Sequence, residues 1–435
     1  MPQDPTSPSD DMTVNSCQDL PPVSIMTPVA PVGAHQTLYA VVGGGQVGVD
    51  PDDHIALVGE PPTLYVTTLK GRLYAVHASD GTVRWCQHVQ LTQERIQQWN
   101  ARHGRRLEPP PSLYLGTARV ANGVVYVCAS GYNCYTHAFN AEDGSLRWRT
   151  PTDGGFVHMP FADYAVPLVR DGIVYTGTYA LQAQDGTMLW RSAIDTRWLS
   201  PQALVDDTLY AVTSTGVYAI NAQNGEVRWH FEADAYTIIS GPLVVADHLL
   251  YVGTSGSIDH PEQSRCYALD AETGTLRWQH PMGDGYVGAV IDNESIHVSS
   301  RDRHLYALEK HNGRLRWKYA FAYPTYHTAT IVGNVVYINT DGAYAISGVD
   351  GTLLWHKDLE SGSGFYCTPS VVVDGAVYLA SGGGAPLASI LYALNASNGA
   401  EYWHKHYPSS IAPLAVVTSA FSSFAIGQSN GEGAS

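Results

Sequence analysis

The chain has 435 residues, of which 44% are hydrophobic and 15% charged, and its formal net charge is −16. A chain this acidic is poorly suited to nucleic acid, because phosphate binding depends on Lys and Arg, and no window approaches the roughly 18 apolar residues of a transmembrane helix. Its 42 glycines and 27 tyrosines favour many short strands joined by tight turns. We therefore expect an all-β protein with no nucleic-acid partner and no membrane span.

Residues 1–34 are rich in Pro, Ser and Asp, which predicts a disordered or linker segment. The start has neither the basic nor the apolar region of a signal peptide, and Cys17 lacks the apolar run that precedes the cysteine of a lipoprotein. As written, the sequence predicts a cytoplasmic protein. A periplasmic or extracellular location would require an export signal upstream of this start.

One pattern recurs eight times along the chain, anchored on a tryptophan. The commonest gaps between anchors are about 38–42 residues, the size of a propeller blade. The anchors are Trp85, Trp148, Trp190, Trp229, Trp278, Trp317, Trp355 and Trp403. A glycine stands four residues before each anchor: Gly81, Gly144, Gly186, Gly225, Gly274, Gly313, Gly351 and Gly399. An alanine stands ten residues before each anchor, and a tyrosine eleven residues before all except one, where His137 replaces it.

Each repeat predicts a four-stranded unit. The segment around the glycine is two short strands joined by a turn, which is Asp-Gly or Asn-Gly in seven of the eight copies and suits the positive φ of tight hairpins. Two apolar strands precede it, and their continuous apolar runs indicate burial on both faces. The sequence therefore predicts an eight-bladed β-propeller with four-stranded antiparallel blades over residues 35–425, and a flexible tail at 426–435.

The two ends of the repeat are incomplete. Residues 37–42 resemble the third strand of a unit, and residues 413–427 resemble the first two. Either these fragments close the ring by strand exchange between the termini, which removes exposed sheet edges, or one of them packs outside the ring.

The longest gap between anchors holds an insertion at residues 87–112, in the second blade region. Residues 91–103 predict a helix that ends at Gly104. This segment is the one basic stretch of an acidic chain and includes Arg95, Trp99, Arg102, Arg105 and Arg106. Arg and Trp are enriched at the energetic centres of interfaces, so these residues are our leading candidates for partner binding. The alternative is a solvated lid whose Trp99 packs on the rim.

Two shorter insertions lie between the second and third strands of their blades and should emerge on one face of the disc. Residues 255–265 include Asp259, His260 and Glu262, which form either a metal site or, as we favour, a polar loop. Residues 381–389 are rich in glycine but join two strands, without the helix N-terminus that binds phosphate.

Three further features concern cysteine and histidine. Cys128 and Cys134 flank a short turn and form either a disulfide or two buried thiols. His404 and His406 lie on the same side of a strand and are either metal ligands or ordinary surface residues. For His137 we expect a packed ring with one hydrogen bond. These patterns assign no catalytic or metal-binding residue, and cofactor-binding residues remain unknown.

The spacing Ala-x5-Gly-x3-Trp, as in residues 75–85, 219–229 and 268–278, resembles the tryptophan-docking repeat of PQQ-type propellers, the quinoprotein alcohol dehydrogenase-like family. The resemblance covers nearly the whole chain. The family includes PQQ-dependent dehydrogenases and non-catalytic members such as BamB. The dehydrogenases hold PQQ with Ca²⁺ or a lanthanide in the central channel, with an acidic base and typically a disulfide between adjacent cysteines. This chain has no adjacent cysteine pair.

The resemblance therefore implies a non-enzymatic, monomeric bacterial propeller without a cofactor. It would bind a protein or small ligand at one face, in a BamB-like role in envelope protein assembly. One alternative is a PQQ-dependent alcohol or aldose dehydrogenase that binds PQQ and Ca²⁺ in the channel. The other is a sensor or adaptor propeller of a bacterial signalling system.

Overall fold

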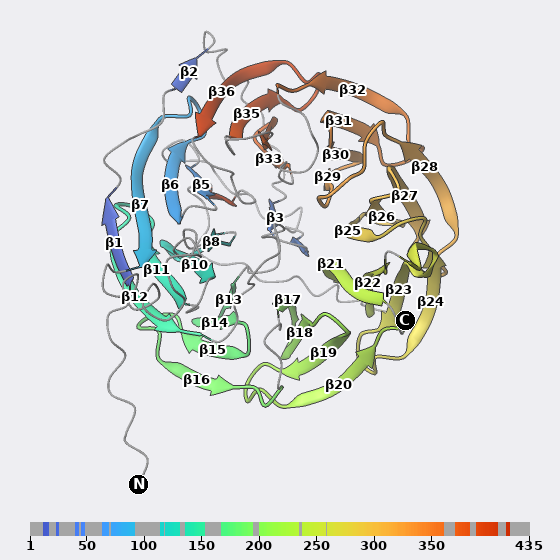
Figure 1. Ribbon diagram of the computed structural model, residues 1–435, viewed down its shortest axis with the longest axis horizontal. Helices are drawn as coiled ribbons and strands as arrows, with labels where there is room; N and C mark the ends of the chain where they lie inside the picture. Colours follow the sequence, from blue (N-terminus) through green and yellow to red (C-terminus); the bar gives the residue numbers. More distant parts are fainter. Residues whose placement is uncertain are drawn as a thin grey trace, which may run out of the picture.

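The computed structural model describes residues 12–16, 23–25, 40–42, 45–47, 63–68, 71–91, 114–116, 118–130, 135–152, 167–194, 200–234, 237–257, 259–360, 370–382, 389–407 and 415–417. Eight antiparallel blades surround a central axis (Figure 1), which confirms the predicted eight-bladed β-propeller. The helix of this part of the chain is the short 3₁₀ helix η2 (Pro261–Gln263). No helix in the described ranges has the length and apolarity needed to cross a membrane.

The strands of the first four blades run from the axis outwards. Blade 1 contains β37 (Ala415–Val417), β5 (Thr63–Thr67), β6 (Arg72–His77) and β7 (Val83–Leu91). Blade 2 contains β8 (Tyr114–Leu115), β9 (Arg119–Ala121), β10 (Val124–Ser130), β11 (Tyr135–Asn140) and β12 (Leu146–Pro151). Blade 3 contains β13 (Leu168–Arg170), β14 (Ile173–Thr176), β15 (Tyr179–Gln182) and β16 (Met188–Arg191). Blade 4 contains β17 (Ser200–Val205), β18 (Thr208–Val212), β19 (Gly216–Asn221) and β20 (Val227–Glu232).

The other four blades follow the same order. Blade 5 contains β21 (Thr237–Ala246), β22 (Leu249–Gly256), β23 (Arg265–Asp270) and β24 (Leu276–Pro281). Blade 6 contains β25 (Tyr286–Ile291), β26 (Ser295–Ser300), β27 (His304–Glu309) and β28 (Leu315–Ala320). Blade 7 contains β29 (Thr330–Val332), β30 (Val335–Asn339), β31 (Gly342–Ser347) and β32 (Leu353–Asp358). Blade 8 contains β33 (Val371–Val373), β34 (Ala376–Gly382), β35 (Ser389–Asn395) and β36 (Glu401–Tyr407).

The chain termini close the ring. The C-terminal strand β37 is the innermost strand of blade 1, where Ala415 lies opposite Tyr65, so strand exchange between the ends does occur. Of the predicted strand at residues 37–42, the described part is β3 (Ala40–Val42), which forms a separate two-stranded hairpin with β4 (Gly45–Val47) and belongs to no blade sheet. Within residues 1–34, which the sequence predicts as a linker, β1 (Met12–Ser16) pairs with β7 and β2 (Val23–Ile25) pairs with β36.

Each anchor tryptophan docks onto the next blade. Its indole N–H donates to a main-chain carbonyl of that blade at 2.8–3.1 Å, in all eight blades. The acceptors, from blade 1 to blade 8, are Ala141, Ala183, Ala222, Ala271, Lys310, Gly348, Ala396 and Ala78. The indole thus satisfies its polar atom while its faces pack in the seam.

The repeated glycine sits under that indole. All eight have φ between +71° and +78°, and an added Cβ would lie 2.5–3.1 Å from an atom of the docked tryptophan or its neighbour. The position therefore excludes a side chain for two independent reasons. The repeated alanine lies directly across the ladder from the tryptophan of its own blade, as in Ala307 opposite Trp317, and the register shifts at this point in each blade.

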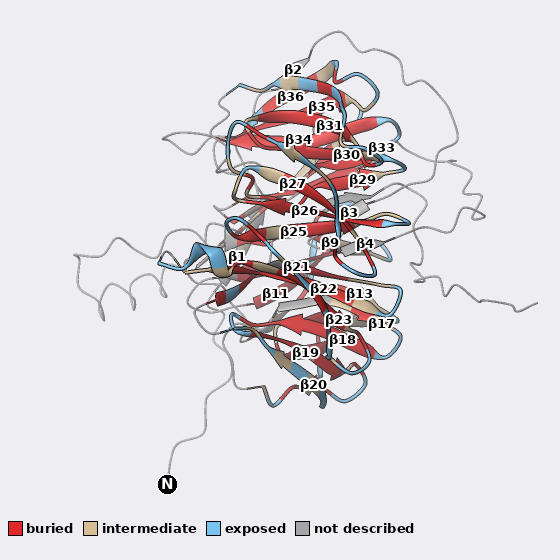
Figure 2. Cartoon of the chain, turned by 90° about the vertical axis from the view of Figure 1, so that its right-hand side faces the viewer, coloured by how far each residue is buried: buried red, intermediate tan, exposed pale blue. Residues whose placement is uncertain are grey.

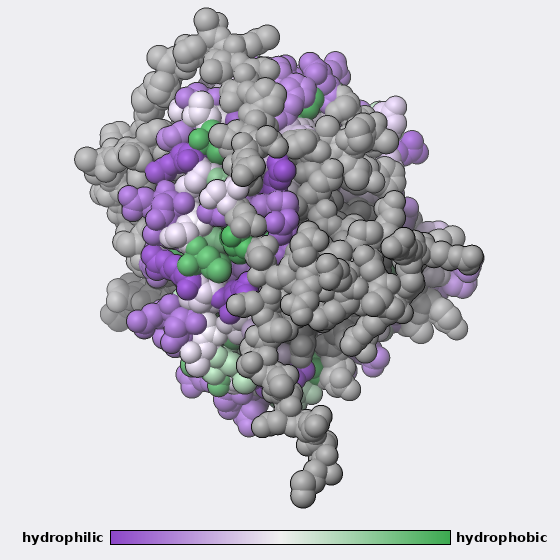
Figure 3. Space-filling view, turned by 60° about the vertical axis from the view of Figure 1, so that its left-hand side comes forward, coloured by the Kyte–Doolittle hydropathy of each residue, from purple (hydrophilic) through white to green (hydrophobic). Residues whose placement is uncertain are grey.

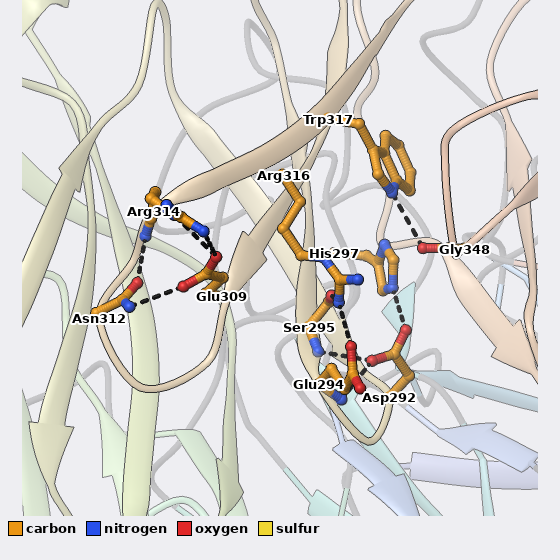
Figure 4. Close-up of polar contacts among 10 residues, drawn as sticks. All are labelled: Asp292, Glu294, Ser295, His297, Glu309, Asn312, Arg314, Arg316, Trp317 and Gly348. Carbon is orange, nitrogen blue, oxygen red and sulfur yellow. Dashed lines mark hydrogen bonds and ion pairs between the residues drawn. The ribbon is translucent and has the colours of Figure 1, made fainter.

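Second-strand tyrosines reinforce six of the seams. Their hydroxyls donate to the same carbonyl as the docked indole, at 2.9–3.4 Å, in Tyr65, Tyr126, Tyr210, Tyr251, Tyr337 and Tyr378. Blade 6 has His297 at this position, whose ring centroid is 5.4 Å from that of Trp317. His297 Nε2 is instead 2.8 Å from Asp292 Oδ2, while Trp317 still donates to Gly348 (Figure 4).

The hydrophobic core is divided among the seams. Among the described residues, eight buried clusters form, and each one joins two neighbouring blades. Figure 2 shows buried strands filling the disc and exposed residues in its connections. Because each core needs both blades, a single blade has little apolar area of its own to bury, as in other repeat proteins.

His137 is the exception among the third-strand tyrosines. It is fully buried, and its ring stacks on that of Phe139 at 6.0 Å. The packed ring is as expected. The pKa of His137 is lowered to about 3, mainly by burial and then by the charge of Arg149, against a smaller raising effect of a hydrogen bond with the Tyr135 backbone.

Two glycines with φ of +71° separate backbone strain from seam packing. A Cβ at Gly313 would lie 2.5 Å from Trp278, whereas a Cβ at Gly123 meets nothing within 4 Å. We expect Gly123→Ala to lower the free energy of unfolding by about 1 kcal/mol through φ alone, and Gly313→Ala by about 3 kcal/mol because overpacking adds to that strain. Denaturant unfolding of both variants measures the difference. Equal losses would show that indole docking does not constrain the glycine.

The buried imidazole of His137 should make the fold acid-sensitive. The pKa of His137 is about 3 in the folded chain against an ordinary value of 6.5, so below about pH 6.5 the unfolded chain takes up a proton that the folded chain does not. We expect His137→Phe to remove about 2 kcal/mol of the stability loss between pH 7 and pH 5. Urea unfolding at both pH values tests this, with the exposed His311→Phe as the control. An unchanged pH dependence in His137→Phe would contradict it.

Candidate functional site: the loop face of the ring

The two faces of the disc carry different connections. In an antiparallel meander, successive connections alternate between the two ends of the sheet. The links from third to fourth strand are five residues long in every blade, and those from first to second strand are two or three residues long in blades 2–8. We call this side the turn face. The opposite side, the loop face, carries the links from second to third strand and from blade to blade, which range from 2 to 22 residues.

All three predicted insertions emerge on the loop face. Residues 92–113 link blade 1 to blade 2, residues 257–264 link β22 to β23, and residues 383–388 link β34 to β35. The two shorter insertions therefore share one face, as their position between second and third strands predicts. The uniform turn face is set by the docking of the seams, so the variable loop face is the place for a binding site.

The base of the 92–113 insertion is braced. Its basic and aromatic residues, Arg95, Trp99, Arg102, Arg105 and Arg106, lie outside the described residues. The strand that leads into it, β7, has nine residues, and its last five pair with β1 from Met12 opposite Leu91 to Ser16 opposite Gln87. The chain returns at Tyr114, which pairs with Ser130. The insertion is therefore anchored at both ends in blade strands.

Cys86 lies on the same strand β7 and is disulfide-bonded. Cys128 and Cys266 are buried thiols, so the partner of Cys86 belongs to the part of the chain outside the described ranges. Cys128 Sγ is 3.1 Å from Thr176 Oγ1, and of the two interpretations for this residue the buried thiol is the one observed. Its proposed partner Cys134 lies outside the described residues.

Third-strand tyrosines on the loop face are held by aspartates in blades 5, 6 and 7. Tyr267 donates to Asp234 at 3.0 Å, Tyr306 to Asp302 at 2.5 Å and Tyr344 to Asp341 at 3.1 Å. Burial, and then the hydrogen bond and charge of Asp234, raise the pKa of Tyr267 to about 12. These hydroxyls therefore stay protonated and act as fixed donors that order the loop face, rather than as acids or bases.

The histidine and carboxylate candidates do not form a metal centre in the described ranges, where no group of three His, Cys, Asp or Glu side chains is placed to hold an ion. His260 Nδ1 is 3.3 Å from Glu262 Oε1 in the exposed loop around η2. The rings of His404 and His406 meet edge to face at 5.4 Å, and His404 Nδ1 is 2.9 Å from Glu401 Oε1. These side chains serve local structure.

The central channel of the ring is the site that a PQQ-dependent dehydrogenase of this family would use for its cofactor. The β3–β4 hairpin lies inside the ring (Figure 1), with its backbone next to the innermost strands β21, β25, β33 and β37. The chain has no adjacent cysteine pair, and the described residues offer no metal-ligand cluster. The described residues therefore do not fit PQQ with a metal ion.

Solved structures with this fold include both kinds of propeller. The chain is similar to BamB from Moraxella catarrhalis, at 13% identity and a TM-score of 0.53, over 88% of this chain and 99% of that one. It is also similar to the quinohemoprotein alcohol dehydrogenase from Comamonas testosteroni, at 13% identity and a TM-score of 0.53, over 69% of this chain and 68% of that one. Identities this low show the fold alone. No curated protein sequence matches the chain.

The sequence model of a protein family gives a closer assignment. The model described as outer membrane protein assembly factor BamB matches residues 91–257, 178–286 and 262–422. Together these matches span blades 2 to 8 and more than half of the chain. The chain therefore belongs to this BamB family of PQQ-repeat propellers.

Proposed function

We propose that the chain is a non-enzymatic scaffold that binds a protein partner through the loop face, with the 92–113 insertion as its most distinctive contact. The observation that carries the proposal is the collection of every long connection on one face of a ring whose other face is uniform. A rigid ring holds such loops at fixed distances from one another, which favours a broad partner surface over a small substrate.

Charge supports the choice of the insertion. The chain has a net charge of −16, yet residues 95–106 contain four arginines and a tryptophan. Arginine and tryptophan contribute most to binding when they enter a partner's pockets. The pairing of β7 with β1 fixes the strand that leads into the insertion, and an ordered attachment reduces the entropy lost on binding.

The family description and the disulfide support a role in the cell envelope. BamB is described as an outer membrane protein assembly factor, and we extend an assembly role to this chain. The disulfide at Cys86 favours an oxidising compartment, the periplasm or the cell exterior, over the cytoplasm. A sensor or adaptor role would use the same loop face and differs in the identity of the partner.

A PQQ-dependent dehydrogenase is the second candidate, because the chain shares its fold with the quinohemoprotein alcohol dehydrogenase. It also shares its fold with a europium-containing methanol dehydrogenase, at 13% identity and a TM-score of 0.53, over 70% of this chain and 81% of the dehydrogenase chain. The β3–β4 hairpin at the axis and the absence of an adjacent cysteine pair weigh against it.

Charge reversal of Arg102, Arg105 and Arg106 to Glu should reduce partner capture from envelope extracts about tenfold. The reason is that the insertion would then repel the acidic groups of a partner that its arginines attract. The matched control reverses Arg147, Arg277 and Arg314 on blades 2, 5 and 6, away from the loop face, with the same change in net charge. Quantitative mass spectrometry of captured proteins measures the effect. Capture that survives in the insertion variant, or fails equally in the control, would contradict the assignment.

Titration of the purified protein with PQQ, with and without Ca²⁺ or a lanthanide, separates the two candidates. The scaffold predicts no saturable change in PQQ absorbance or tyrosine and tryptophan fluorescence, and no reduction of a dye by alcohols or aldoses. Tight binding with turnover would replace the scaffold by the dehydrogenase.

A further inference from the structure

The outer edge of each blade is the free side of its fourth strand. Blades 1 and 8 have this edge covered by the chain itself: β1 pairs with β7, and β2 pairs with β36 through Val23 opposite Lys405 and Ile25 opposite Trp403. Both added strands are antiparallel. No described strand covers the outer edges of β12, β16, β20, β24, β28 or β32. The ring therefore accepts added strands at its rim, and six edges are available within the described part.

Natural sheets protect such edges with charge. In five blades the residue before the anchor tryptophan is an arginine: Arg84, Arg147, Arg228, Arg277 and Arg316. Several of these side chains are fixed over the strand, as Arg316 is by Glu294 at 2.9 Å and Ser295 at 2.8 Å (Figure 4). On the side of the molecule drawn in Figure 3, hydrophobic patches are small and separated by hydrophilic side chains.

Blade 7 departs from this pattern at two positions. Leu354 stands where five blades have arginine and is 51% exposed, whereas blade 3 has Leu189 and blade 8 has Tyr402 at this position. Leu353 beside it is 46% exposed and occupies a position that is also leucine in blades 2, 5 and 6. In the preceding turn, Val349 is 57% exposed, where the other blades have Ser, Glu, Gln or His. Because five other blades fold with arginine beside the tryptophan, the fold does not require leucine here. We call these three exposed apolar residues, which lie within six positions of one another in the sequence, the blade-7 patch.

The blade-7 patch lies directly beside a filled edge. Its strand β32 belongs to the blade next to β36, whose edge carries β2, and Lys357 of β32 is 3.3 Å from Glu401 of β36. The same rim thus shows one edge with an added strand and a neighbouring edge that no described strand covers, with two exposed leucines before its tryptophan and His356, Lys357 and Asp358 after it. Main-chain hydrogen bonds would supply affinity at such an edge, and the exposed side chains would supply selectivity.

We propose that β32 binds an extended segment of a partner protein as an added antiparallel strand, with the blade-7 patch covering its apolar side chains. The sequence of β2, Val-Ser-Ile, indicates the chemistry of the occupant: apolar residues two apart, opposite the positions of Trp355 and Lys357, with a small polar residue between them. This proposal rests on the proposed scaffold function and adds a second contact, on the rim instead of the loop face.

A synthetic peptide of residues 20–28, which carries the β2 sequence, is a suitable probe. Hydrogen exchange measured by mass spectrometry on the full chain should show slower exchange of the amides of residues 353–358 when the peptide is bound. The double variant Val349→Glu and Leu354→Arg should weaken binding at least about tenfold, since it removes two apolar contacts. Both residues occur at the same positions in other blades, so the variant should keep the fold.

Two controls make the result specific. Leu189→Arg makes the same change on blade 3, across the ring, and should leave peptide protection of β32 intact. A peptide that is N-methylated on its edge-facing amides should fail to protect β32, because it cannot form the ladder. Should the double variant unfold, Val349→Ser, with the residue found in blades 1 and 8, gives the same test at one position.

Absence of protection at residues 353–358, or protection that persists with the N-methylated peptide or in the folded double variant, would overturn strand addition at β32. These outcomes are separate from the scaffold proposal. The reversal of Arg102, Arg105 and Arg106 should leave peptide protection unchanged, and loss of strand addition leaves capture through the insertion standing.

Discussion

The docking of each tryptophan onto the glycine turn of the next blade is the interaction on which the rest of the structure depends. It fixes the distance and angle between blades, because the indole face rests on a residue that admits no Cβ and its N–H reaches a fixed carbonyl. The closing seam uses the same contact between residues 325 positions apart, Trp403 and Ala78, and adds a buried Lys405 whose Nζ donates to Gly81 at 2.8 Å. Eight equal seams leave no weak edge at which the ring would open.

This contact explains the division between the two faces. The five-residue turn must present both its glycine and its carbonyl to the preceding blade, so its length and backbone are the same in every copy. None of the eight indole–carbonyl contacts involves a described residue of the loop face, so the lengths of its connections are not set by the docking. A propeller can therefore acquire a binding surface on its loop face with little loss of stability, because the entropic cost of closing a surface loop grows slowly with its length.

The sequence predicts the parts of the fold that follow from this periodic contact. Eight tryptophans with glycine and alanine at constant offsets are sufficient for the blade number, the hairpins and the face on which the insertions emerge. The pairing partners of short strands outside the repeat cannot be predicted in this way. Val23–Ile25 and Ala40–Val42 have only three residues each, too few for a hydrophobic pattern that identifies the neighbouring strand. The same holds for Cys86, whose disulfide no local spacing suggests.

The internal repeat also serves as a control for function. A residue that departs in character from its counterparts in other blades, at a position where those blades fold equally well, is not explained by the needs of the fold. By this reasoning the replacement of Tyr by His297 is structural, because Asp292 compensates for it within the same blade. Val349 has no such compensation: its seven counterparts are polar, and together with Leu354, a leucine shared only with blade 3, it exposes apolar surface at an edge that no described strand covers. Exposed apolar surface at an open edge is what a partner strand would cover.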